Sequence, residues 1–194
     1  MLLFPSNIAQ NKIEIRKFVK KIRHNLYITG QSDRISKLIT ENILKSDIFL
    51  DSKNVMIFYP TKEEISLLGL MKCENKNFYF PKCNGRDMLV CKQNSPEVEN
   101  FSLNKYGILE PKSEPICDLS ILDVIFVPAL CADVNCARIG YGGGYYDRFF
   151  AKNNLCVKKV IVTSDKFLCE NLPQEEFDLP CDIVICENAV YFRN

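Results

Sequence analysis

The sequence predicts an α/β fold, and three observations carry this prediction. Apolar runs typical of strands alternate along the chain with segments of helical periodicity, the order that produces a parallel sheet covered by helices. One run, "DVIFVP" (123–128), is apolar at almost every position, which is typical of a strand buried on both faces. Hydrophobic residues make up 47% of the 194 positions, enough to form a sizeable core. We therefore expect a three-layer, Rossmann-like fold with a mainly parallel central sheet in a single domain, residues 1–194.

Two amphipathic helices are expected at the start of the chain. Residues 6–28 carry apolar side chains at three-, four- and seven-residue intervals, with Ser6 as the expected N-cap. These apolar positions are Ile8, Ile15, Phe18, Ile22 and Leu26. A second helix is expected at 32–45, and its inward-facing residues are Ile35, Leu38, Ile39 and Ile43.

The remaining elements follow from shorter patterns. A strand is expected at 54–60 and ends at Pro60. A helix is expected at 63–73, because its first turn would hold acidic residues, which the helix dipole stabilises there. The glycine-rich stretch after residue 137 leads into a helix that begins near Gly144. Further strands are expected at 77–81, 87–92, 123–128, 156–164 and 182–187.

The charge balance and the apolar runs exclude two classes of partner. With 25 basic and 24 acidic residues the formal net charge is +1, so the chain lacks the basic excess of a nucleic-acid-binding protein. The N-terminal apolar run lasts about four residues, and no stretch approaches the ~20 apolar residues of a membrane span. We therefore expect a soluble, cytoplasmic monomer that binds neither nucleic acid nor membrane.

The ten cysteines are scattered and form no C-x-x-C pair, and the chain's single histidine, His24, lies far from them. Buried, reduced thiols that act as small hydrophobic residues are the expected state. Two alternatives remain open. One is a reactive thiol at Cys131 or Cys136. The other is a zinc site, for which the candidate ligands are Cys131, Cys136, Cys181 and Cys186.

The stretch "RIGYGGGYYDRFF" (138–150) holds four of the 8 glycines of the chain. Ligands of open α/β sheets bind beyond the carboxyl ends of strands, and this stretch follows one. Glycine lets backbone amides converge on phosphate oxygens, and the following helix adds the positive end of its dipole. We favour an anion-binding loop over the alternative, a turn that only packs helix against strand. A Walker A loop is excluded by the missing Gly-Lys-Ser/Thr, and a dinucleotide fingerprint by Tyr145 at its third glycine position.

The same stretch resembles the signature of the 5-formyltetrahydrofolate cyclo-ligases (methenyltetrahydrofolate synthetases), roughly R-L-G-x-G-x-G-Y-Y-D. Matches to other family motifs occur in the same order along almost the whole chain. They are "KIEIR" (12–16), "YPTKEEIS" (59–66), "YGILEP" (106–111), "VPALCAD" (127–133) and the segment 172–182. The sequence departs from the family pattern at Ala132, near Cys136, and at Phe177, which stands where the family has histidine.

This resemblance implies an enzyme that uses ATP and Mg²⁺ to convert 5-formyltetrahydrofolate to 5,10-methenyltetrahydrofolate, with release of ADP and phosphate. The formyl oxygen would attack the γ-phosphoryl group, and N10 would then close the ring. Such chemistry needs two aligned substrates and donors for the charge on the transferring oxygens.

The resemblance also implies a role for particular residues. The catalytic residues would be Arg138, Tyr145 and Asp147, and the metal ligands Asp147 and Asp178. The ATP-binding residues would be Lys12, Arg16, Arg138, Ile139, Gly140, Tyr141, Gly142, Gly143, Gly144, Tyr145 and Tyr146. The folate would contact Tyr59, Glu64, Tyr141, Gly142, Gly143, Gly144 and Tyr145.

Without the resemblance, these residues have simpler interpretations. Lys12 and Arg16 would belong to a solvated basic stripe on the first helix, and Asp147 would cap a helix. Asp178 would shape a turn, and Glu64 would be an ordinary first-turn acid. The tyrosines would be packing residues, and Arg148 is either a phosphate contact or a helix-surface residue. Two other functions remain open: a different phosphoryl transferase with a non-Walker glycine loop, or a sugar-phosphate or folate-binding module without turnover.

Overall fold

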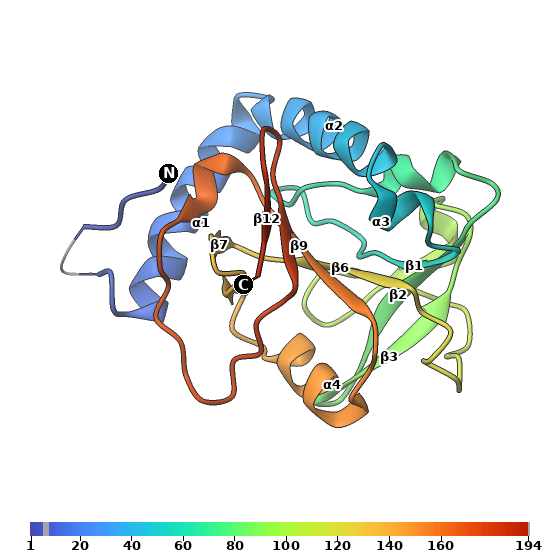
Figure 1. Ribbon diagram of the computed structural model, residues 1–194. Coiled ribbons are helices and arrows are strands. Elements are labelled where there is room, and N and C mark those ends of the chain that lie inside the picture. The colour runs from blue at the N-terminus through green and yellow to red at the C-terminus, as the bar shows by residue number, and fades with distance from the viewer. Residues whose placement is uncertain (6–7, 194) are drawn as a thin grey trace.

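The computed structural model describes residues 1–5 and 8–193, and within them a seven-stranded sheet forms the centre of the molecule (Figure 1). The strand order is β12-β11-β9-β6-β1-β2-β3. The inner neighbours pair in parallel, and only the edge strands β3 and β12 are antiparallel. The strands are β1 (Asn54–Met56), β2 (Asn77–Asn84), β3 (Asp87–Lys92), β6 (Val124–Pro128), β9 (Lys158–Val162), β11 (Ile183–Ile185) and β12 (Val190–Phe192). The predicted, mainly parallel sheet is confirmed.

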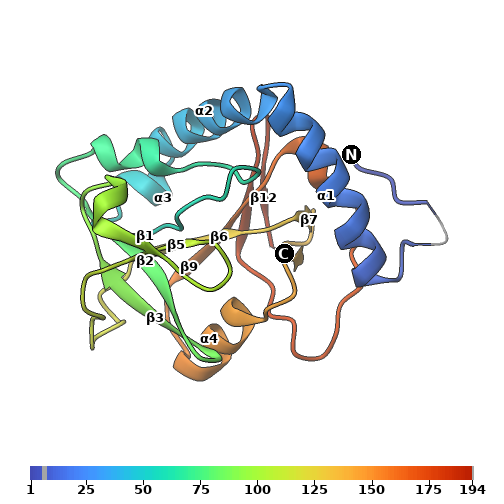
Figure 2. The ribbon, with the colours of Figure 1, turned by 180° about the vertical axis from the view of Figure 1, so that it is seen from behind.

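Helices cover both faces of this sheet. On one face lie α1 (Lys12–Ile28) and α2 (Gln31–Leu44), and on the other lies α4 (Tyr145–Asn153) (Figures 1 and 2). The central strand β6 shows why, because its side chains alternate between two cores. Val124 and Phe126 belong to the core under α1 and α2, whereas Ile125 and Val127 belong to the core under α4. The three-layer arrangement is thus a direct consequence of the apolar run at 123–128.

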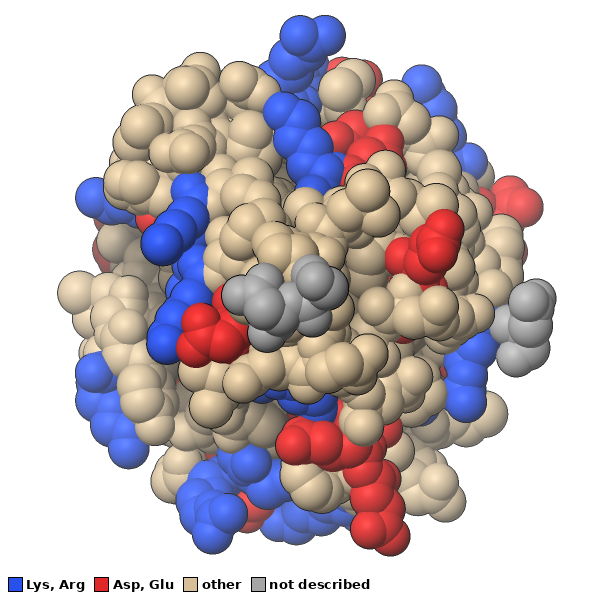
Figure 3. Space-filling model, turned by 90° about the vertical axis from the view of Figure 1, so that its left-hand side faces the viewer, with Lys and Arg blue, Asp and Glu red and all other residues tan. Residues whose placement is uncertain are grey.

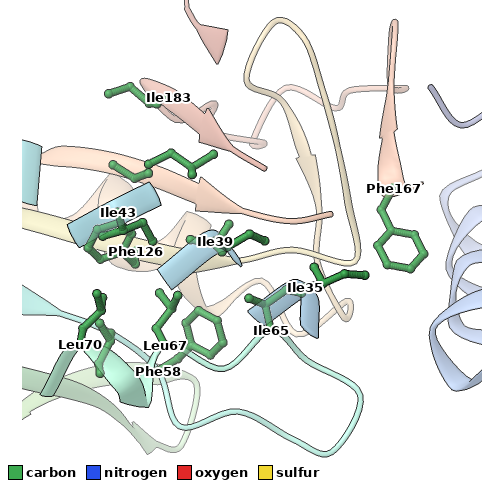
Figure 4. Packing of buried hydrophobic residues seen from close by; sticks show 14 of the residues in the cluster. Ile35, Ile39, Ile43, Phe58, Ile65, Leu67, Leu70, Phe126, Phe167 and Ile183 are labelled. Carbon is green, nitrogen blue, oxygen red and sulfur yellow. The ribbon is translucent and has the colours of Figure 1, made fainter. Parts of the chain in front are cut away.

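Figure 4 shows the core between α2 and the sheet. Ile35, Ile39 and Ile43, spaced four residues apart, form the buried stripe of α2, whereas Leu38, also predicted to face inward, is exposed. They pack toward side chains from several parts of the chain, including Phe58, Ile65, Leu67, Leu70 and Phe126.

The first helix begins later than predicted. It starts at Lys12 rather than residue 6, because Asn11 caps it: the Asn11 side chain accepts hydrogen bonds from the amides of Ile13 (2.9 Å) and Glu14 (3.3 Å). Residues 8–10 form a turn, and Ser6, the predicted cap, lies outside the described residues. The later start places Lys12 in the first turn of α1, where its side chain faces the loop that contains Asp178.

The predicted helix at 63–73 is wrong, and the strand predicted at 54–60 ends already at Met56. The Glu64 carboxylate accepts a hydrogen bond from the Thr61 amide (2.8 Å), and the Glu64 amide donates to the Thr61 carbonyl (3.1 Å). This closed turn is followed by Ile65 and Leu67, which are both buried, a spacing of two that a helix cannot bury on one face. Only the short 3₁₀ helix η1 (Leu68–Lys72) follows.

Several short elements were not predicted. They are the helix α3 (Asp47–Leu50), the 3₁₀ helices η2 (Val98–Asn100) and η3 (Asp165–Phe167), and the strands β4 (Phe101–Leu103), β5 (Leu109–Pro111), β7 (Cys131–Asp133), β8 (Arg138–Ile139), β10 (Leu168–Cys169) and β12. The strands β4 and β5 form a hairpin, and β10, β7 and β8 form a small second sheet. Elements of two to four residues have no hydrophobic periodicity to detect, and their pairing partners lie elsewhere in the chain.

All ten cysteines are free thiols, and the prediction of buried thiols is confirmed for six of them: Cys91, Cys131, Cys136, Cys169, Cys181 and Cys186. Cys156, the first residue of the strand predicted at 156–164, is exposed because β9 begins only at Lys158. Burial raises the pKa of Cys131 to about 12 and that of Cys136 to about 11, which opposes the reactive-thiol alternative. Among the described residues no group of three His, Cys, Asp or Glu side chains could hold a metal ion, so the zinc alternative has no support there.

The surface of the described residues carries both signs of charge. Figure 3 shows Lys and Arg interspersed with Asp and Glu over one face of the molecule, in keeping with the formal net charge of +1. Within the described part of the chain, every helix is too short or too polar to cross a membrane.

Candidate active site

A cleft of about 1790 Å³ opens beyond the carboxyl ends of β1 and β6. The chain continues from β1 to β2 on one side and returns through β6 and β9 on the other, so the strand order reverses between β1 and β6. In open α/β sheets ligands bind at this switch point. Every residue to which the family resemblance assigns a role lines this one cleft: Lys12, Arg16, Tyr59, Glu64, Arg138, Ile139, Gly140, Tyr141, Gly142, Gly143, Gly144, Tyr145, Tyr146, Asp147 and Asp178.

The glycine loop, residues 140–144, runs along the cleft between β8 and α4. Gly142 (φ +101°) and Gly144 (φ +63°) have left-handed backbone conformations that favour glycine. A Cβ atom at Gly143 would lie 2.9 Å from the Tyr145 ring, and one at Gly144 would lie 2.6 Å from Nη1 of Arg148. The neighbouring side chains therefore pack directly on bare backbone, which a simple turn does not require.

Arg16 on α1 lies against this loop. Its Nε donates a hydrogen bond to the Gly140 carbonyl (2.9 Å), and its guanidinium carbon would be 3.6 Å from a Cβ atom at Gly142. Lys17, the next residue, is 65% exposed and pairs with Glu14 on its own helix. The basic side chains of α1 are thus divided: Arg16 belongs to the cleft, while Lys17 belongs to the solvated face.

Lys12 is also drawn into the cleft, but toward acidic partners. Its ammonium group forms ion pairs with Asp178 and with Glu175 (2.7 Å), and only 12% of its side chain is exposed. The Asp178 carboxylate also accepts a hydrogen bond from the Glu175 amide (2.7 Å), which supports the turn interpretation for Asp178. The segment 175–178 therefore closes one end of the cleft against the first turn of α1.

Arg138 and Asp147 form a nearly buried ion pair of 2.7 Å, in which 6% and 21% of the side chains are exposed. Asp147 also accepts a hydrogen bond from the Leu179 amide (3.4 Å). Nε of Arg138 and the hydroxyl of Tyr146 are buried without a hydrogen-bond partner. Buried polar atoms are normally paired, so these two atoms of the cleft lining are the ones that a polar ligand could satisfy.

The two carboxylates predicted to bind metal fit Mg²⁺ only in combination with a substrate. Mg²⁺ usually takes one or two carboxylates together with phosphate oxygens and water. Asp147 and Asp178 supply that number of carboxylates, and the amide next to Asp178 donates to Asp147. Each is already paired with a cationic side chain, Arg138 or Lys12. Within the described residues no third acidic, His or Cys ligand joins them, so phosphate oxygens would have to complete the site.

The other wall of the cleft contains Tyr59 and Glu64. The Tyr59 ring packs on Phe101 of the β4–β5 hairpin, with ring centroids 4.6 Å apart. Burial, followed by the nearby Glu64 carboxylate, raises the pKa of Tyr141 well above its ordinary value. The two predicted folate contacts Glu64 and Tyr141 are therefore neighbours in space, although they are 77 positions apart in the sequence.

Arg23 supports this wall from behind and was not recognised from the sequence. It is only 2% exposed and donates hydrogen bonds to the carbonyls of Ala129 (2.5 Å), Leu130 (3.1 Å) and Glu63 (3.1 Å). Burial lowers the pKa of Arg23 below its ordinary value. One guanidinium thus joins α1, the segment after β6 and the turn that contains Glu64. The position of Arg23 on α1 did not indicate its burial, since arginine on a helix is usually exposed.

The first turn of α4 is fixed to two hairpins. The Tyr145 hydroxyl donates to the Gly85 carbonyl (3.0 Å) and lies 3.3 Å from the Tyr106 hydroxyl. The hydrogen bond with Tyr106, followed by burial, raises the pKa of Tyr145 above its ordinary value. Arg148 donates twice to the Arg86 carbonyl (2.9 and 3.0 Å). Arg148 therefore binds the β2–β3 turn, a contact that was not among the roles considered for it from the sequence.

The fold and the cleft define an α/β protein with a glycine loop in a cleft at its topological switch point, where a ligand site is expected. The model of the 5-formyltetrahydrofolate cyclo-ligase family matches residues 8–187, and the chain belongs to this enzyme family. It is 30% identical over 188 residues to the 5-formyltetrahydrofolate cyclo-ligase of Haemophilus influenzae, covering 91% of this chain and 98% of that protein.

Two solved structures are similar to the chain. The NMR structure of the Aquifex aeolicus 5,10-methenyltetrahydrofolate synthetase has a TM-score of 0.80 and 30% identity, and the match covers 93% of this chain and 92% of that one. The 5,10-methenyltetrahydrofolate synthetase of Mycoplasma pneumoniae shares the fold, with a TM-score of 0.71 at 16% identity over 90% of this chain and 98% of that one. The fold predicted from the sequence is therefore confirmed.

Proposed function

We propose that this enzyme converts 5-formyltetrahydrofolate to 5,10-methenyltetrahydrofolate in an ATP- and Mg²⁺-dependent reaction, with residues 1–194 acting as one domain. The observation that carries the proposal is the convergence of Arg16 and Arg138 on the glycine loop, in the same cleft as Tyr59 and Glu64. One end of the cleft is cationic and lined by bare backbone, which suits a triphosphate. The other end is aromatic with a carboxylate, which suits a pterin. We also propose that the enzyme acts as a monomer.

In the proposed reaction, the chain mainly positions and neutralises charge. The amides of the glycine loop and the guanidinium groups of Arg16 and Arg138 bind the triphosphate, with Lys12 joining after it leaves Asp178. Asp147 and Asp178 would hold Mg²⁺, which supplies positive charge beside the phosphate oxygens. Donors that are already in place where charge develops lower the barrier without reorganisation at the moment of reaction.

The proposed reaction has two covalent steps. The formyl oxygen attacks the γ-phosphorus, a new P–O bond forms, and the bond to the leaving ADP breaks. N10 then attacks the formyl carbon and loses its proton, the C–N bond closes the ring, and the C–O bond to phosphate breaks. Glu64 accepts hydrogen bonds from the amino-pyrimidinone edge of the pterin, and Tyr145 orients the formyl group over the glycine loop.

A coupled assay tests the proposal. Methenyltetrahydrofolate absorbs in the near ultraviolet, and its appearance should require the protein, ATP, Mg²⁺ and 5-formyltetrahydrofolate together, while EDTA should abolish it. ADP is measured in parallel. Formation of ADP without the methenyl product would favour a different phosphoryl transferase. Binding of folate without either product would favour a module without turnover, and both outcomes would contradict the proposal.

A further inference from the structure

The motif "YGILEP" (106–111) has no role in the proposed reaction, yet it contains the buried residue Glu110. The motif lies in the β4–β5 hairpin, where Glu110 pairs with Ser102 across the two strands. Glu110 is 9% exposed and lines the cleft. A carboxylate that is so little exposed requires hydrogen-bond partners.

A single oxygen of Glu110 joins two hairpins. Its Oε1 accepts one hydrogen bond from the Cys83 amide on β2 (2.9 Å) and a second from the Asn104 side-chain amide (2.7 Å). Cys83 lies near the end of β2, just before the β2–β3 turn, and Asn104 begins the β4–β5 turn. Glu110 therefore fixes the two turns relative to each other at the edge of the cleft.

Asn104 extends this connection to Tyr106. Its Oδ1 accepts hydrogen bonds from the amides of Tyr106 (2.8 Å) and Ile108 (3.0 Å), so one side chain shapes the turn between β4 and β5. The Tyr106 hydroxyl then meets the Tyr145 hydroxyl (3.3 Å), with ring centroids 6.4 Å apart. Tyr145 in turn donates to the Gly85 carbonyl (3.0 Å), two positions after Cys83. The contacts that begin and end at the β2–β3 turn therefore form a closed circuit of hydrogen bonds.

We propose that Glu110 is a positioning residue for the folate: it holds the Tyr106 turn against Tyr145 and so sets the width of the folate end of the cleft. The inference rests on one part of the proposed function, the binding of 5-formyltetrahydrofolate in this cleft. Glu110 acts as a hydrogen-bond acceptor and not as an acid or base, because the two hydrogen bonds to its Oε1 come from amide N–H groups. An amide oxygen in the same place can accept the same two bonds, whereas a methyl group cannot.

The test compares Glu110→Ala with Glu110→Gln, and uses Glu114→Ala as a matched control. Glu114 lies in the same segment but is exposed and does not line the cleft. The dissociation constant of 5-formyltetrahydrofolate is measured by calorimetry without ATP, and KM is measured for both substrates. We expect Glu110→Ala to weaken folate binding about tenfold with the KM for ATP within about twofold of wild type. Glu110→Gln and Glu114→Ala should bind folate like wild type.

A second variant keeps the test valid if Glu110→Ala folds poorly. Asn104→Ala should weaken folate binding by a similar factor, and the double variant should lose little more, because both residues act through one circuit. Equal loss for Glu110→Gln and Glu110→Ala would overturn the positioning role. So would a loss of thermal stability in Glu110→Ala with unchanged folate affinity. If the wild type binds folate but forms no product, the proposed function fails while this inference stands.

Discussion

At the residue scale, Arg138 is the side chain on which the proposed chemistry depends most. It pairs with Asp147 at 2.7 Å while only 6% exposed, and its Nε is left without a partner. A buried ion pair contributes little net stability, because desolvation offsets the attraction. A role in ligand binding explains the pair better, since Asp147 holds the guanidinium in one orientation at the cleft while Nε has no partner.

We expect Arg138→Ala to lower kcat/KM about 10²–10³-fold, the loss typical of removing one donor to developing charge. Arg138→Lys should recover only part of this, because it restores the charge but not the planar fork. Steady-state kinetics with varied ATP measures the effect, and circular dichroism verifies folding. Lys17→Ala, which removes an exposed charge from α1, is the control and should match wild type. Unaltered ATP kinetics in Arg138→Ala would contradict the assigned role.

At the element scale, the first turn of α1 is closed against the segment 175–178. Lys12 pairs with Asp178 and Glu175, although both it and Asp178 are predicted to bind the nucleotide and its metal. Binding of a triphosphate must therefore separate these groups, and Glu175 competes with phosphate for the Lys12 ammonium. Glu175 is 56% exposed, so this competition is weak.

We expect Glu175→Gln to lower the KM for ATP by up to about fivefold, since an exposed ion pair is worth at most about 1 kcal/mol. The difference should shrink at high salt, which screens the pair. Glu176→Gln, at an exposed neighbouring position, tests for a general effect of lost negative charge. An equal change in KM for both variants would show that Lys12 is not the group released.

At the scale of the whole molecule, the cleft exists because the strand order reverses between β1 and β6. The reversal leaves room above the sheet, and α1 and the two hairpins enclose it. The small β10-β7-β8 sheet leads into the glycine loop through β8, and its cysteines, Cys131 and Cys169, are buried. Burial raises the pKa of Cys131 and Cys169 to about 12, and of Cys136 and Cys181 to about 11, from an ordinary value of 9.0.

From the raised pKa values of these thiols, we predict that the free energy of unfolding of the protein falls at alkaline pH. Each is protonated in the folded state above the pH at which it ionises in the unfolded chain, so folding is favoured fully below about pH 8.5–9 and progressively less as pH rises toward 11. We expect the midpoint of urea unfolding to fall over that range. Cys131→Ala should flatten the fall, while Cys117→Ala, at an exposed position, should leave it unchanged. A midpoint independent of pH between 8 and 11 would contradict the prediction.

Much of the fold and of the candidate site could be predicted from the sequence. The apolar run of β6 and the spacing of Ile35, Ile39 and Ile43 on α2 are local patterns, and their burial follows from those patterns. The glycine loop is contiguous, so its backbone requirement is visible in the residue types. The prediction of a helix at 63–73 was wrong, because the Thr61–Glu64 turn and the burial of both Ile65 and Leu67 outweigh the local helix propensity.

Other parts of the site could not be predicted because distant segments create them. Arg23 is buried only because carbonyls of the segments after β6 and around Glu63 surround it. Glu110 gains its role from Cys83, 27 positions away, and from the turn that Asn104 builds. No local sequence pattern indicates which side chains will contact one another across a cleft.

The sequence by itself determined the alternation of strands and helices, the glycine loop and the membership in the cyclo-ligase family, because each depends on residues that are contiguous or in fixed order. The tertiary structure decided that Lys12 meets Asp178 across 166 positions and that Arg16 contacts Gly140 across 124. It also decided that Tyr106 faces Tyr145. These contacts depend on strand order and on the packing of α1 and the hairpins over the switch point, which are properties of the folded chain and of no single segment.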